Sequence, residues 1–171
     1  SGMIALTVAD NDYFTSPEPR LSGKVTVANA VRQLVCRGAK PAAISIRNIF
    51  PDLAEEKDHW KGIEILKGQE EAVRVLELKI ANRHILPFSN LCVQHITAVG
   101  FIPDNQSPMT SGFKQDGDFI SILGSHRGEL GGTKYMQNLH PDIAANPPTV
   151  DLPMEPLIHE VLLQSIQEGL I

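Results

Sequence analysis

The alternation of apolar and polar residues divides the first part of the chain into short regular elements. Residues 4–9 alternate and predict a strand. A helix is predicted over 25–37, where the apolar positions recur at helical spacing, and Gly38 then fits a C-terminal cap. The apolar positions of that helix are Val27, Ala30, Val31, Leu34 and Val35. Residues 42–49 alternate again and predict a second strand.

The middle of the chain carries a charged segment followed by two apolar ones. Residues 52–83 have an apolar stripe at helical spacing, which predicts helix with a break at Lys67-Gly68. Residues 85–88 and 92–102 are apolar and predict two strands. This order of elements indicates an α+β fold, in which a mixed or antiparallel sheet carries its helices on one face.

The last third of the chain is organised around glycines. A predicted strand at 119–123 leads into a segment with four glycines in nine residues, and a short helix is predicted over 129–138. An amphipathic helix is predicted over 156–168. A strand, a glycine-rich turn and a helix start together provide N–H groups that hold an anion. The spacing matches neither the P-loop nor the dinucleotide fingerprint, so a plain tight turn stays an alternative.

Composition removes several classes of function. The net charge of −5 over 171 residues argues against nonspecific nucleic-acid binding, and we see no apolar run of membrane-spanning length. The start of the chain does not resemble a signal peptide, and the predicted location is cytoplasmic. Cys36 and Cys92 are predicted to be buried free thiols of a reducing compartment. The six histidines lack zinc-site spacing, so no metal ligand is assigned, although His126 lies beside the glycine segment.

Four motifs in a fixed order resemble one known enzyme family. They are Ser22 to Pro41, Gly112 to Asp118, Gly124 to Tyr135, and Pro148 to Glu155 followed by a helix that ends at Ile171. In this order the chain resembles phosphoribosylformylglycinamidine (FGAM) synthase, and more narrowly the second of its two aminoimidazole-ribonucleotide-synthetase-like repeats. The resemblance covers roughly 5–51 and 99–171.

The resemblance implies an architecture and an activity. Residues 1–103 would form the N-terminal lobe of the synthetase-like fold, and 104–171 would form an incomplete C-terminal lobe, as in a fragment. The family is an ATP-dependent C–N ligase of purine biosynthesis, which uses Mg²⁺ and ammonia from a glutaminase domain to convert formylglycinamide ribonucleotide to its amidine. The implied partners are the remainder of the synthase or a second copy, with a small-molecule nucleotide and without nucleic acid or membrane. The segment alone is expected to be inactive.

Residue-by-residue matching gives a set of candidate nucleotide- or substrate-binding residues, while no catalytic residue is assigned. The candidates are Lys24, Lys114, Arg127, Glu129, Gly131, Gly132 and Thr133.

Several positions depart from the family pattern. Asn29 and Gln33 stand where the family has Glu and Asn, and Ile46 and Ile49 replace polar residues. These departures keep open the alternative of a noncatalytic scaffold or interaction domain with a degenerate nucleotide site. A selenophosphate synthetase or a hydrogenase maturation factor is a further alternative, against which the Gly-Glu-Leu-Gly-Gly segment argues.

Overall fold

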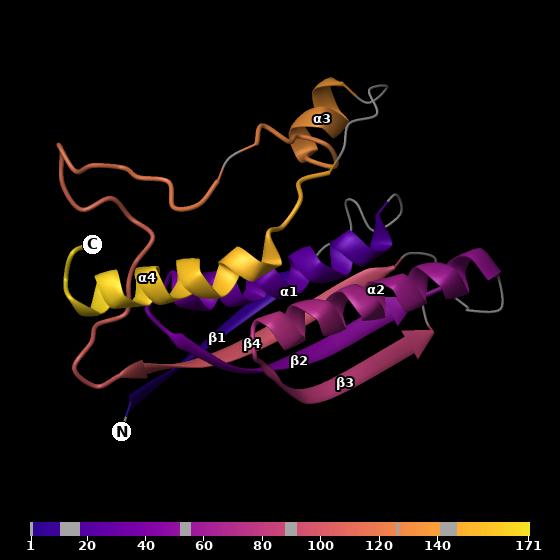
Figure 1. Cartoon of the computed structure of the whole chain (residues 1–171), viewed down its shortest axis with the longest axis horizontal. Coiled ribbons are helices and arrows are strands. Elements are labelled where there is room, and N and C mark those ends of the chain that lie inside the picture. Colours follow the sequence, from indigo (N-terminus) through magenta and orange to yellow (C-terminus); the bar gives the residue numbers. More distant parts are fainter. Residues whose placement is uncertain (1, 11–17, 52–55, 88–91, 126, 141–146) are drawn as a thin grey trace.

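The computed structural model describes residues 2–10, 18–51, 56–87, 92–125, 127–140 and 147–171. The elements run in the order strand, helix, strand, helix, strand, strand, and then helices (Figure 1). They are β1 (Gly2–Asp10), α1 (Pro19–Val35), β2 (Lys40–Phe50), α2 (Glu56–Val75), β3 (Lys79–Pro87), β4 (Val93–Pro103), α3 (Lys134–Leu139), the 3-10 turn η1 (Leu152–Met154) and α4 (Glu155–Gln167). No helix in these described ranges is long and apolar enough to cross a membrane.

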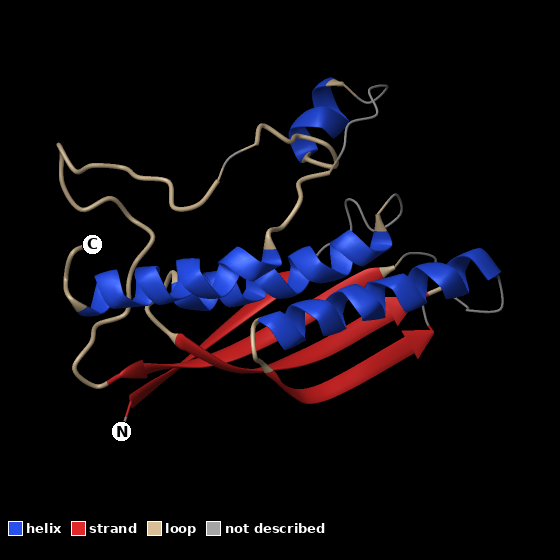
Figure 2. Ribbon diagram, viewed as in Figure 1, coloured by secondary structure: helices blue, strands red, loops and turns tan. Residues whose placement is uncertain are grey.

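The four strands form one mixed sheet in the order β1-β4-β2-β3. β4 pairs antiparallel with both β1 and β2, whereas β2 and β3 are parallel and are joined through α2. The helices α1, α2 and α4 all lie on the same side of the sheet (Figure 2). The predicted α+β fold, with a mixed sheet and helices on one face, is therefore confirmed.

The core lies between the sheet and its two covering helices. Leu34 of α1, Ile65 of α2 and Ile46 of β2 are completely buried there, together with Ile96 of β4. Their burial follows the alternation of each strand and the helical spacing of α1, because those patterns put apolar side chains on one face. Ile46, which replaces a polar family residue, is thus a core residue in this chain.

The helices α1 and α2 touch backbone to backbone where two glycines face the opposite helix. A Cβ built on Gly68 would overlap the carbonyl oxygen of Arg20, and one built on Gly23 would overlap that of Ile65. Glycine is the residue type that permits such close approach. The predicted break at Lys67-Gly68 is therefore wrong, because α2 continues through Gly68. The Ser22-Gly23-Lys24 motif lies inside α1, whereas the helix was predicted to begin only at residue 25.

A chain of buried amide side chains ties the two helices to the sheet. Gln69 of α2 exchanges two hydrogen bonds with Asn48 of β2, at 3.0 and 2.8 Å, and its Nε2 also donates to Gln94 Oε1 of β4 at 3.0 Å. Gln94 Nε2 then donates to Ser22 Oγ of α1 at 2.6 Å. All four residues are fully buried, so each bond also removes the cost of an unpaired polar group.

The opposite face of the sheet has no described helix over it and is apolar along β1. Ile4, Leu6 and Val8 point to that side and are 67%, 69% and 60% exposed. Phe101 of β4, which lies directly opposite Ile4, is also exposed. Contiguous apolar surface of this kind marks an interaction site in a folded protein.

Three predicted elements differ in the structure. The helix predicted to continue to residue 83 ends at Val75, because residues 79–87 pair with β2 as the edge strand β3. Residues 119–123 belong to no strand in the described chain, and Phe119 is fully exposed. The helix predicted over 129–138 begins only at Lys134, after the glycine turn.

Cys36, predicted to be buried, is exposed, although both cysteines are free as predicted.

A buried carboxylate fixes α4 against α1. Glu155 is 5% exposed, and Arg32 of α1 binds both of its oxygens, with Nε donating to Oε2 at 2.8 Å. His159 Nε2 lies 3.2 Å from Oε2, an ion-pair distance, but lacks hydrogen-bond geometry to any described partner. Burial alone would raise the pKa of Glu155, but the contacts from His159 and Arg32 outweigh it and lower that pKa to about 2.

This clamp predicts a loss of stability in acid. Because the folded-state pKa of Glu155 lies below its ordinary value of 4.5, the clamp stabilises fully above that value and is lost as the pH falls toward 2. The free energy of unfolding should fall by at most about 3 kcal/mol, since each unit of difference between the folded and ordinary pKa of Glu155 contributes ~1.4 kcal/mol. Urea unfolding of wild type and Glu155→Gln should differ most near pH 7 and converge near pH 2. Exposed Glu160 of the same helix is the control, and an equal pH dependence for Glu155→Gln and Glu160→Gln would contradict the clamp.

Candidate anion-binding site

A cavity of about 390 Å³ lies between the two covering helices and the segment that leads into α4. It is lined by three cations, Lys24 of α1, Arg74 of α2 and Arg127 of the glycine-rich segment. The remaining lining residues are Glu71, Val75, Thr149, Val150, Asp151, Leu152 and Pro153. Three cations around one small cavity make it the strongest candidate for holding an anion.

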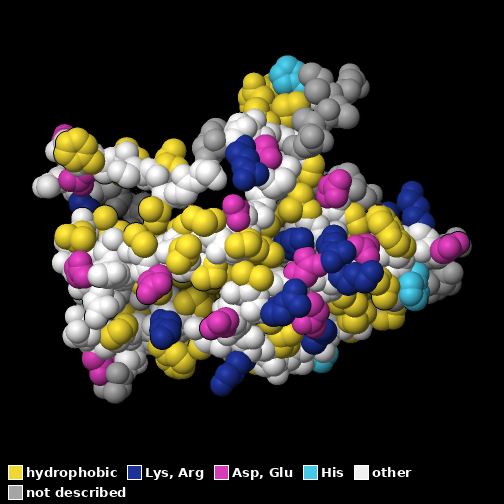
Figure 3. Space-filling view, in the orientation of Figure 1, with side chains coloured by type: hydrophobic (Ala, Val, Ile, Leu, Met, Phe, Trp, Pro, Cys, Tyr) yellow, Lys and Arg dark blue, Asp and Glu magenta, His cyan; other side chains and the backbone are white. Residues whose placement is uncertain are grey.

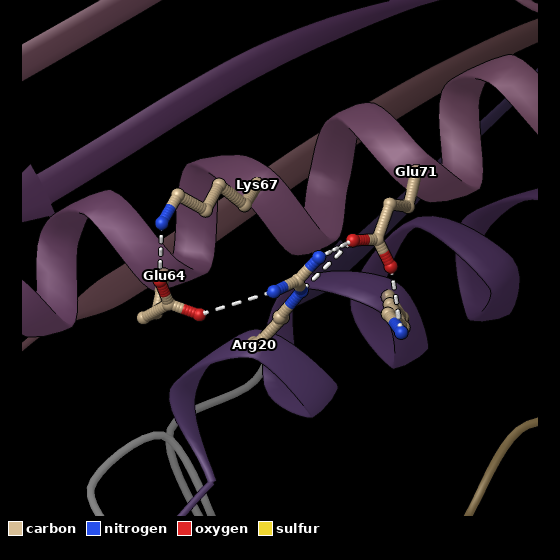
Figure 4. Close-up of polar contacts among 5 residues, drawn as sticks. Arg20, Glu64, Lys67 and Glu71 are labelled. Carbon is tan, nitrogen blue, oxygen red and sulfur yellow. Dashed lines mark hydrogen bonds and ion pairs between the residues drawn. The ribbon is translucent and has the colours of Figure 1, made fainter.

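An ion-pair cluster of Arg20, Glu64, Lys67 and Glu71 joins α1 to α2 (Figure 4), and Lys24 is held in place by its pair with Glu71. Its Nζ lies 2.7 Å from Glu71 Oε2, and Arg20 donates to the other oxygen, Glu71 Oε1, with Nε at 2.8 Å. The bonds from Lys24 and Arg20 keep the pKa of Glu71 below its usual value. Arg20 also lies 3.7 Å from Glu64, which itself pairs with Lys67 at 2.6 Å. Lys24 therefore reaches the cavity already paired with Glu71, which it shares with Arg20.

Arg127 enters the cavity from the opposite wall. Its Nη1 donates to Thr149 Oγ1 at 3.4 Å, and its Nη2 lies 4.0 Å from Asp151 Oδ2, so both contacts are long. Glu129 lies beside it and accepts from the Thr149 N–H at 2.9 Å and from the Thr149 hydroxyl at 3.1 Å. The N–H bond, aided by the hydroxyl and by Arg127, lowers the pKa of Glu129. Glu129 thus holds Thr149 in place, and Arg127 stays only weakly paired.

Arg74 is the cation that the sequence motifs did not indicate. It is exposed at the end of α2 and lines the cavity, and its side chain forms no ion pair or hydrogen bond with another described residue. It lies outside residues 5–51 and 99–171, over which the motifs were matched, so no motif covers it. Its position does follow from helical spacing, because residue 74 lies one turn after Glu71 and so shares the face that meets Lys24.

The other predicted site residues lie away from the cavity wall. Thr133 caps the six-residue helix α3, with its hydroxyl accepting from Met136 N at 3.4 Å, and Gly132 adopts a left-handed φ of +71° in the preceding turn. Gly131 is buried beside it. Lys114 contacts Thr110 within its own exposed loop. The structure thus brings Lys24 and Arg127 together and leaves Gly131, Gly132, Thr133 and Lys114 outside the cavity; His126 lies outside the described residues.

The cavity fits an anionic group better than it fits a divalent cation. Both oxygens of Glu71 and of Glu129 are engaged by neighbouring donors, and Asp151 faces Arg127. In the described ranges no three His, Cys, Asp or Glu side chains come together as a metal group. These residues therefore do not fit the Mg²⁺ that the resemblance implied, whereas Lys24, Arg74 and Arg127 suit a phosphate. On the surface, charges of both signs gather over α1 and α2 (Figure 3).

The fold and the cavity define a class of protein, an α+β domain in which a mixed four-stranded sheet carries on its helical side a cavity lined by Lys24, Arg74 and Arg127. Residues 4–102 match the family described as AIR synthase related protein, N-terminal domain. That match covers more than half of the chain, and the chain belongs to this family.

Individual relatives extend the likeness beyond residue 102. The chain is 29% identical over 174 residues to the phosphoribosylformylglycinamidine synthase subunit PurL of Anaeromyxobacter sp. (strain Fw109-5), covering 98% of this chain and 23% of that protein. Thermotoga maritima PurL complexed with FGAR has the same fold over 97% of this chain and 27% of its own, with a TM-score of 0.69 and 14% identity. The predicted resemblance to this synthase family is confirmed, and the chain spans less than a quarter of the curated relative.

The fold also occurs outside that synthase. Thiamine monophosphate kinase from Aquifex aeolicus matches 58% of this chain and 34% of its own, with a TM-score of 0.52 and 17% identity. At such identities the likeness concerns the fold alone. The match over nearly the whole chain is with PurL, whereas the kinase matches little more than half.

Proposed function

We propose that this chain is a segment of a PurL-type FGAM synthase, corresponding to the second of its synthetase-like repeats. The observation that carries the proposal is the likeness to PurL over 98% of the chain, which includes the motif region after residue 102. Residues 1–103 would be the N-terminal lobe and 104–171 part of the C-terminal lobe. The reaction is the ATP- and glutamine-dependent amidation of formylglycinamide ribonucleotide in the cytoplasm.

In this function the chain supplies binding rather than the complete ligase chemistry. Lys24 and Arg127 line a cavity suited to phosphate, which supports nucleotide or ribonucleotide binding. PurL of Thermotoga maritima is also known in a complex with ATP, with a TM-score of 0.65 over 97% of this chain. On its own the segment is expected to bind without turnover.

The open face of the sheet supports a partner in the assembly. Ile4, Leu6, Val8 and Phe101 present an exposed apolar surface on the side away from the helices. Covering it would remove this surface from water, at about 25 cal/mol per Å² of apolar area. The partner is the remainder of the synthase or a second copy of the chain.

Nucleotide binding is tested by thermal unfolding of the whole chain with ATP, ADP or formylglycinamide ribonucleotide. A ligand that binds only the folded state at a hundredfold excess over its Kd adds about 2.7 kcal/mol, which raises Tm by several degrees. Gly132→Val should abolish the shift if the glycine turn contributes, because valine disfavours the left-handed φ of +71°. Exposed Gly112, which has open space around it, gives the control Gly112→Ala. A Tm unchanged by all three ligands would indicate a scaffold.

A further inference from the structure

We propose that Arg74 and Arg127 together form a phosphate receptor at the cavity, with Arg74 as the principal contact. The proposal rests on the proposed function and deepens it, because it names the group of the ligand that this chain recognises and a residue that no motif indicates. The ligand class is a phosphate ester, either the phosphate of a sugar phosphate or the polyphosphate of a nucleotide.

The pairing of the three cations separates their roles. Lys24 is paired with Glu71 at 2.7 Å, and Arg20 binds the other oxygen of the same carboxylate. Lys24 is therefore a positioning residue, which fixes α1 against α2. Arg74, by contrast, has no ion-pair partner in the described part of the chain, and Arg127 has only contacts of 3.4 and 4.0 Å. These two guanidinium groups are therefore the cations of the cavity that no described carboxylate binds at hydrogen-bond distance.

The chemistry of the guanidinium suits a phosphate at this place. Each arginine offers a planar fork of N–H donors that matches two phosphate oxygens, and a bound dianion offsets the repulsion between the two positive charges. The volume of about 390 Å³ lies at the low end of small-molecule sites, roughly 300–1,000 Å³. The cavity thus has room for a phosphate with a small adjoining group rather than for a whole nucleotide.

The opposing charges at the cavity also have defined roles. Glu71 and Glu129 both accept from protein donors and do not compete for Arg74 or Arg127 at hydrogen-bond distance. Asp151 is the remaining carboxylate, at 4.0 Å from Arg127, and it competes weakly with a ligand for that arginine. Removing its charge should therefore tighten phosphate binding.

The test is calorimetric titration of the whole chain with pyrophosphate, ribose 5-phosphate and ADP at low ionic strength, where screening is weak. Wild type should bind at least one of them. Arg74→Gln and Arg127→Gln should each weaken that binding about tenfold or more, the usual loss of a charge-assisted hydrogen bond. Arg74→Lys should recover part of it, and Asp151→Asn should strengthen it. A preference for ribose 5-phosphate or for pyrophosphate and ADP identifies the source of the phosphate, and either supports the receptor.

The matched control is Lys67→Gln, which removes one exposed positive charge from the same helix without touching this cavity. Its affinity should stay within about twofold of wild type, because an exposed charge pair contributes little. The receptor is refuted if Lys67→Gln weakens binding as much as Arg74→Gln, if Arg74→Gln binds as wild type, or if none of the three probes binds. Nucleotide binding that survives Arg74→Gln but fails in Gly132→Val would overturn the receptor and leave the proposed function intact.

Discussion

Replacing Gly68 by alanine should destabilise the folded chain by about 3 kcal/mol or more, although the same change normally stabilises a helix by up to ~1 kcal/mol. The reason is the contact between helices: a Cβ at this position would overlap the Arg20 carbonyl, and the backbone there cannot turn away as a side chain can. α1 and α2 would have to separate, which also strains the Lys24–Glu71 pair at the cavity. Urea unfolding followed by circular dichroism measures the change.

Two further variants test whether the contact between the helices causes this loss of stability. Gly23→Ala, which meets the Ile65 carbonyl from the other helix, should cost a similar amount. Gly112→Ala, in a loop with open space around it, should stay within about 0.5 kcal/mol of wild type. If Gly68→Ala proved neutral or stabilising, as helix propensity alone would make it, the close approach of the two helices would be wrong.

Gln69→Leu alone should lower the free energy of unfolding by on the order of 3 kcal/mol. The substitution leaves both amide atoms of Asn48 and the Gln94 Oε1 buried without their Gln69 partner, whereas Gln94 Nε2 keeps its bond to Ser22. Each buried polar group left unpaired costs about 1–3 kcal/mol, and Gln69 serves two neighbours. The measurement is again the free energy of unfolding, and exposed Gln167 supplies the control Gln167→Leu, which should be nearly neutral.

A second experiment separates the hydrogen bonds from packing. In the triple variant Asn48→Leu, Gln69→Leu and Gln94→Leu the orphaned amides are gone, so its stability should exceed that of Gln69→Leu alone. If the triple variant were no more stable than Gln69→Leu, the loss of stability would come from side-chain packing rather than from unpaired polar groups.

The sequence predicted the elements best where one periodicity acted alone. Alternation predicted β1 and the strand over 92–102, and helical spacing predicted α1 and α4, with errors of a few residues at their ends. Residues 79–83 were predicted as helix because Val73, Leu76 and Ile80 continue an apolar stripe; pairing with β2 overrides that local pattern. Residues 119–123 alternate well, but a strand needs a hydrogen-bonded neighbour, and no described strand lies beside them.

The candidate site was predictable only in part. Motif matching identified Lys24 and Arg127, and both line the cavity. It could not show that Lys24 is paired, because Glu71 lies on another helix, 47 residues away in sequence. Placing Arg74 at the cavity likewise required knowing how α2 packs against α1. A motif identifies residues along one segment of the chain, whereas the contacts between two helices are known only from their packing.

The pairing of β1 sets the order in which the domain can fold. Gly2 lies opposite Pro103 and Asp10 opposite His95, so the strand made first at the ribosome pairs with the strand made last. The β2-α2-β3 unit, by comparison, joins neighbouring elements and closes a short loop. Long loops cost more entropy to close and slow the step that needs them. The N-terminal strand must therefore wait through most of the synthesis of its own domain with its backbone N–H and C=O groups unpaired, and chaperone binding is most valuable during that interval.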